Sequence, residues 1–172
     1  GRDNEDPTAE DLAQMTELVE EAMRAGAVGF STSRTIGHRS ITGDPVPGTF
    51  AETEELLALA EAMERVGSGV FELIPAGTVG KMEGLGGEKA TLLEEFEMIK
   101  KIGRVGRPVT FTTVQNSDYP DDWREFLKGS AEENAKGSNL RPQVASRPIG
   151  FVTGLQTYHM FQRRESYLKI AD

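Results

Sequence analysis

Glu72 is the residue whose type and position say most about possible chemistry. It lies inside the apolar segment Val70–Ile74, which we expect to form a strand. Strand side chains alternate between two faces, so a carboxylate there is buried and must be paired, protonated or metal-bound. We predict that Glu72 is catalytic and orients a ligand or a water molecule. A salt bridge to an interior Arg or Lys is the structural alternative.

Two cationic side chains lie in a loop rich in Gly and Pro, residues 33–48. His38 is predicted to act as a catalytic acid or base, or to hold a substrate carboxylate. Arg34 is predicted to bind that carboxylate, because its planar fork can grip both oxygens. The alternative for both is a solvent-exposed polar loop.

Further polar residues follow the third and fourth expected strands. Thr113 and Gln115 are predicted to hydrogen-bond a substrate amide, and the alternative is a polar strand end that caps the next helix. Gln143 and Arg147 approach the end of the last strand and are also predicted to bind substrate. Arg141 lies on the same strand face as Gln143 and would line the pocket or pair with Glu72.

Two other polar residues are given structural interpretations. Asp118 precedes the fourth expected helix and is interpreted as an N-cap rather than as a catalytic acid. His159 is isolated among aromatic neighbours, and we interpret it as a packed or surface residue rather than a ligand.

These residues are positioned by an alternation of helices and strands. Strands are expected to begin near residues 27, 69, 108 and 140. Amphipathic helices are expected before the first strand and between successive strands. Asp6 is predicted to cap the first helix, and Thr49–Glu52 has the form of a capping box for the second. Apolar strands alternating with such helices indicate an α/β fold with a parallel sheet.

In parallel α/β folds, ligands bind at the carboxyl ends of the strands. Both long loops, residues 33–48 and 75–90, leave from those ends. A complete (β/α)₈ TIM barrel takes about 250 residues, so four strands cannot close one. The chain is therefore either a small open sheet or a fragment of about four strands from a barrel, and the periodicity leaves both open.

Composition restricts the partners. The 172-residue chain carries a net charge of -9, which argues against binding to nucleic acid or to an anionic membrane. It has no cysteine and so no disulfide or thiolate metal site. The chain lacks an apolar run of membrane-spanning length, and its polar first residues do not form a signal peptide. We expect a cytoplasmic protein with a small-molecule substrate.

The segment EAMRAGAVGFST, Glu21–Thr32, resembles the "EAxxAGAxGFST" stretch of N-acyl-D-amino-acid deacylases, members of the amidohydrolase superfamily. Residues Thr53–Leu56 resemble the "TEEL" helix of the same family, and the β/α layout extends the likeness to about residue 146. The resemblance implies that residues 1–172 are a partial domain, with strands four to seven of a metal-dependent barrel. It also implies zinc-assisted hydrolysis of a linear amide C–N bond.

The sequence departs from that family at its metal-binding motifs. A His expected after the second strand is replaced by Leu73-Ile74-Pro75, and Thr113 stands where a second His is expected. A threonine hydroxyl is a poor zinc ligand and Ile74 is none. We therefore predict no metal ligand in this chain, and any zinc would be held by residues outside it.

Three functional hypotheses remain. In the first, the chain belongs to an amidohydrolase-like enzyme acting on N-acyl (D-)amino acids, and its partners are the remainder of the barrel or a second copy. The second is a non-catalytic or metal-free binding module on a degenerate amidohydrolase barrel. The third is a self-contained small α/β domain, which predicts a folded monomer.

Overall fold

The computed structural model describes residues 5–80 and 90–148, and from there residues 150, 152, 154–156, 159, 161–162 and 164–171. Within these residues the chain is an α/β structure with one four-stranded sheet, which confirms the expected fold class. Most of the glycine-rich stretch of the second long loop lies outside the described residues.

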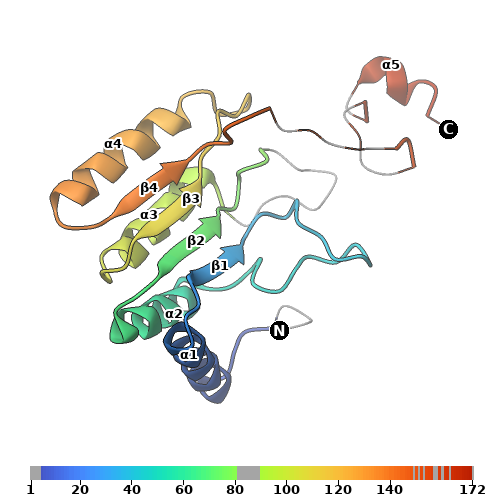
Figure 1. Cartoon of the computed structure of the whole chain (residues 1–172). Coiled ribbons are helices and arrows are strands. Elements are labelled where there is room, and N and C mark those ends of the chain that lie inside the picture. The colour runs from blue at the N-terminus through green and yellow to red at the C-terminus, as the bar shows by residue number, and fades with distance from the viewer. Residues whose placement is uncertain are drawn as a thin grey trace.

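Helices and strands alternate as expected (Figure 1). In chain order the elements are α1 (Ala9–Arg24), β1 (Gly29–Ser33), α2 (Thr53–Val66), β2 (Val70–Ile74), α3 (Leu92–Gly103), β3 (Val109–Thr112), α4 (Asp122–Ala135), β4 (Leu140–Gln143) and α5 (Glu165–Leu168). All pairings are parallel and the strand order is β1-β2-β3-β4. Each crossover therefore moves one strand along the sheet in the same direction.

The four long helices form one layer on one face of the sheet (Figure 1). α1 packs on α2, α2 on α3, and α3 on α4. In β2, Phe71 and Leu73 point into this layer and are buried, whereas Val70, Glu72 and Ile74 keep part of their surface exposed. The same alternation in β3 and β4 leaves the opposite side of the sheet accessible, and we call it the open face.

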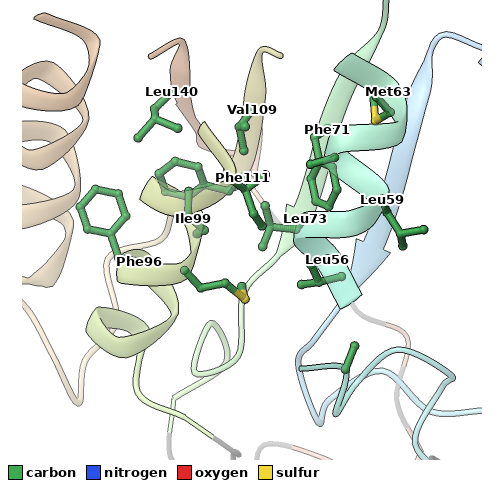
Figure 2. Close-up of a cluster of buried hydrophobic side chains, with 14 of the residues drawn as sticks. Leu56, Leu59, Met63, Phe71, Leu73, Phe96, Ile99, Val109, Phe111 and Leu140 are labelled. Carbon is green, nitrogen blue, oxygen red and sulfur yellow. The ribbon is translucent and has the colours of Figure 1, made fainter. Parts of the chain in front are cut away.

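The hydrophobic core lies between the helices and the sheet (Figure 2). The rings of Phe96 in α3 and Phe126 in α4 meet edge-on, with centroids 5.2 Å apart. Phe111 of β3 contacts both rings, at 5.8 and 6.3 Å. Leu56, Leu59 and Met63 of α2 cover the β2 side of the same core, so the apolar stripes that predicted the helices are the faces that pack on the sheet.

Helix starts differ from the sequence predictions. Thr8, not Asp6, is the N-cap of α1, and it forms a reciprocal capping box with Asp11. The second capping box was predicted wrongly, because α2 begins at Thr53 and the Thr49 hydroxyl donates instead to the carbonyl of Val46.

The fourth helix also starts later than predicted. Its N-cap position is Asp121, and no side chain caps it. The interpretation of Asp118 as N-cap was therefore wrong. The backbone N–H of Asp118 is itself held by the side-chain oxygen of Asn116, at 2.8 Å, so this stretch forms a turn before the helix rather than its first residue.

Candidate functional site

Glu72 lies near the middle of the open face. The strand register aligns it with Ser31 of β1, Thr110 of β3 and, one strand further, Arg141 of β4. The Ser31 hydroxyl donates a 2.7 Å hydrogen bond to Glu72 Oε2. These four polar residues form one row across the sheet.

Full burial of Glu72 was expected, and the structure corrects this. The side chain is only partly buried, because the described helices cover the other face of the sheet. Within residues 5–80 and 90–148, Glu72 makes no ion pair, and the Arg141 guanidinium does not reach it. Within the described part of the chain, the Ser31 hydroxyl is thus the one hydrogen-bond partner of this carboxylate, which keeps part of its surface exposed to solvent.

His38 folds back onto the carboxyl end of β1. Its Nδ1 lies 2.7 Å from the Ser33 hydroxyl. Ser33 and Ser31 are two residues apart on one strand, so they share a face and lie about 7 Å apart along it. The structure therefore brings a serine–histidine pair and a serine–carboxylate pair to the same side of β1.

Arg34 has a different environment from the one expected. Its guanidinium is buried and donates to both carboxylate oxygens of Glu95, at 2.7 and 2.9 Å. A third donor bonds the carbonyl of Ala51. The guanidinium that was predicted to bind a substrate carboxylate thus binds the carboxylate of Glu95 instead. Arg34 therefore has a structural role in this structure.

The ends of β3 and β4 supply the other predicted residues. Thr113 is buried, its N–H donates to the carbonyl of Gln143 at 2.7 Å, and its hydroxyl has no hydrogen-bond partner in the described part of the chain. Gln115, Gln143 and Arg147 have exposed side chains. These three are accessible at the carboxyl end, whereas Thr113 lies beneath it.

The loops after β2 and β3 touch each other. Gly80 adopts a positive φ of 76°, and a Cβ there would lie 2.6 Å from Asn116 Nδ2 and 2.8 Å from Asp118 Oδ2. A side chain at position 80 would therefore push the loops apart, so glycine allows the close approach.

His159 is packed, as expected, against Tyr167, with ring centroids 4.9 Å apart.

The residues at the strand ends do not fit a zinc site. Ile74 ends β2 and Thr113 follows β3, and neither offers the imidazole or carboxylate that zinc prefers. No group of three or more His, Asp or Glu side chains in the described residues is arranged to hold a metal ion.

Comparison with known proteins gives no further assignment, since no family, curated protein or solved structure matches the chain. Among the described helices, none combines the length and apolar character needed to cross a membrane.

Three residues of this region carry no predicted role. Ser31 and Ser33 are two of them, although their i, i+2 spacing places both on one face of an expected strand. Glu95 lies in the acidic start of α3, beside the exposed Glu94. Its i+4 and i+7 spacing to Ile99 and Ile102 places it on the buried stripe of the helix. Its partner Arg34 could not be predicted locally, because it is 61 residues away.

Proposed function

We propose that the chain forms the central βα units of an amidohydrolase-like barrel hydrolase that cleaves linear amide C–N bonds, such as those of N-acyl (D-)amino acids. The observation that carries the proposal is the Ser31–Glu72 hydrogen bond on an accessible, polar sheet face. A sequential parallel sheet with helices on one face has the layout of barrel βα units, whose sites lie at the carboxyl ends of the strands.

In this proposal the chain's own residues supply the proton chemistry. Glu72 orients the attacking water and takes its proton as oxygen adds to the amide carbon. His38 delivers a proton to the leaving nitrogen, so that the C–N bond breaks to give a carboxylic acid and an amine. Gln115 and Gln143 hydrogen-bond the substrate amide, and the exposed Arg147 replaces Arg34 as the cation for the substrate carboxylate.

The substitution Glu72→Gln tests this role, because it keeps the acceptor for Ser31 but removes the base. We expect the rate of N-acetyl-D-methionine hydrolysis by the intact protein to fall by about 100-fold or more. Glu64→Gln, on the exposed surface of α2, is the matched control. Full activity in Glu72→Gln would remove Glu72 from the mechanism, and no hydrolysis of any acylated amino acid by the wild type would remove the function.

A second candidate is a metal-free binding module on a degenerate barrel, and the edge of β4 favours it. Closing a barrel requires β4 to pair with a further strand. Pro142 has no N–H to donate, and both backbone groups of Leu140 are occupied by the side chain of Asn134. Calorimetric titration of wild-type protein with N-acetyl-D-methionine separates the two, since a module binds the compound without consuming it.

A further inference from the structure

A serine–histidine pair lies at the carboxyl end of β1. Ser33 is the last residue of that strand, and its hydroxyl oxygen lies 2.7 Å from Nδ1 of His38. Ligand sites of parallel α/β proteins lie at this end of the strands, both in open sheets and in barrels. A serine hydroxyl within hydrogen-bond reach of an imidazole is the arrangement that activates a nucleophile. The position and the geometry of the pair therefore suit covalent chemistry.

The turn that carries His38 is anchored in the protein interior. Residues 34–36 follow Ser33 directly and are 5% exposed or less. The N–H of His38 donates to the carbonyl of Thr35 at 3.2 Å, and the Arg34 guanidinium is held by an internal carboxylate. Because these contacts fix the turn, the Ser33 hydroxyl is not needed to hold it in place. The imidazole is thus positioned beside the hydroxyl before any substrate arrives, as catalysis requires.

Both members of the pair are accessible, and one side of their surroundings is apolar. His38 is exposed and Ser33 is half-buried, so a molecule in solvent can reach both. The strand register aligns Ser33 with Ile74 of β2, whose side chain keeps part of its surface exposed on the open face. Aligned residues on neighbouring strands lie about 5 Å apart. The space beside the hydroxyl therefore suits a short, uncharged group.

Ser31 lies on the same face of β1 but has a different partner. Its hydroxyl donates to Oε2 of Glu72 at 2.7 Å, and a carboxylate is a weaker base than an imidazole. Ser33 is thus the better activated of the two hydroxyls, although the two residues share one strand and one face. This difference gives an internal comparison for any test of reactivity.

We propose that Ser33 is a nucleophile with His38 as its general base, and that the pair cleaves uncharged carboxylic esters with a short acyl group. The Ser33 hydroxyl oxygen attacks the ester carbonyl carbon while its proton passes to Nδ1 of His38. His38 then gives this proton to the leaving alkoxide as the ester C–O bond breaks, so that the acyl group stays on Ser33. This activity is separate from the amide hydrolysis proposed above and does not involve Glu72.

A second half-reaction restores the free enzyme. Water attacks the carbonyl carbon of the acylated Ser33 and gives a proton to Nδ1 of His38. The bond between the carbonyl carbon and the Ser33 oxygen breaks, the proton returns to that oxygen, and a carboxylic acid is released. The net reaction consumes one ester and one water and gives one acid and one alcohol.

The first probe is an alkyl fluorophosphonate, which an activated serine attacks at phosphorus with loss of fluoride. Mass spectrometry of the labelled protein should show one adduct, and peptide mapping should place it on Ser33. Ser33→Ala should abolish this adduct. His38→Gln retains a polar side chain but cannot take the proton, so labelling should slow by about 100-fold or more. Ser117→Ala, which removes an exposed hydroxyl in the loop after β3, is the matched control and should be labelled as the wild type is.

The second probe is phenyl acetate, with phenol release followed by absorbance. We expect the rate to fall by about 100-fold or more in Ser33→Ala and in His38→Gln. Acid quenching during turnover should trap an acetyl group on Ser33. Ser33→Cys keeps a nucleophile beside His38 and should still accept the acetyl group, which a merely structural role for the hydroxyl would not predict.

Three results would overturn the proposal. An adduct on Ser31 in place of Ser33 would assign the reactive hydroxyl to the pair with Glu72. Labelling of His38→Gln at the wild-type rate would reduce the Ser33–His38 hydrogen bond to a structural contact. Absence of any Ser33 adduct in the wild type with both probes would exclude the nucleophile, and this result decides even if Ser33→Ala fails to fold.

Discussion

Arg34 and Glu95 form a buried ion pair with two parallel hydrogen bonds, although 61 residues separate them in the chain. Their side chains are 4% and 3% exposed. Glu95 also accepts from the backbone N–H of Ala76, at 3.2 Å. The pair therefore joins the end of β1, the loop after β2 and the first turns of α3 beneath the candidate site.

We predict that Glu95→Gln strongly destabilises the protein, because it leaves the Arg34 charge buried without its partner. Loss of one member of a buried pair costs about 3–5 kcal/mol. Glu97→Gln, in the same helix, removes an exposed pair with Lys100 and should cost less than about 1 kcal/mol. Urea unfolding followed by circular dichroism measures both.

The double substitution of Arg34 by Met and Glu95 by Leu distinguishes charge from packing. Replacing both charges with apolar side chains removes their desolvation cost, so part of the lost stability should return. The recovery is incomplete, because the Ala51 C=O and the Ala76 N–H lose their partners. Equal losses in Glu95→Gln and Glu97→Gln would instead show that the pair contributes no more than a surface contact.

A second prediction concerns acid stability and Glu133. Hydrogen bonds from Arg104 and Lys136 lower the pKa of this carboxyl from 4.5 to about 2. A depressed folded-state pKa stabilises the protein above the unfolded pKa, and this contribution is lost as the pH falls from 4.5 to 2. Glu133→Gln should therefore be less stable at neutral pH and lose stability less steeply in acid.

The measurement is the urea midpoint of wild type and Glu133→Gln at a series of pH values from 7 to 2. Glu132→Gln is the neighbouring control on the exposed side of α4, and its pH profile should match the wild type. Parallel profiles for wild type and Glu133→Gln would mean that the two cations do not stabilise the folded carboxylate.

Asn134 gives a third prediction, for the closed edge of β4. Asn134→Ala leaves the N–H and C=O of the buried Leu140 without partners, which should cost about 1–3 kcal/mol. Asn134→Asp keeps the acceptor for the N–H and should lose less. Unfolding free energies and the exchange rate of the Leu140 amide check both variants, and an unchanged Leu140 exchange rate in Asn134→Ala would contradict the capping role.

The sequence predicted the elements well because each depends on a local pattern. Leu56, Leu59 and Met63 recur at helical spacing along α2, and Gly67, with a φ of 80°, ends that helix. The start of α1 was predicted wrongly, because Thr8 forms a local capping box with Asp11, and this T-x-x-D spacing is a stronger N-cap signal than a lone Asp6. The interaction of Arg34 with Glu95 and the open side of Glu72 could not be predicted, since both depend on which face the helices cover.

A fourth prediction tests the packing of α4 against α3 at Gly129. A Cβ on Gly129 would lie 2.5 Å from the ring of Phe96. Alanine in a helix gains about 1 kcal/mol over glycine, whereas overpacking a core costs about 1–3 kcal/mol. Gly129→Ala should therefore be destabilising on balance. Because Phe96→Leu removes the obstructing ring, adding Gly129→Ala to that variant should restore stability rather than reduce it further. Equilibrium unfolding of the two single variants and the double variant gives the coupling energy, and simple additivity would show that helix and ring do not compete for this space.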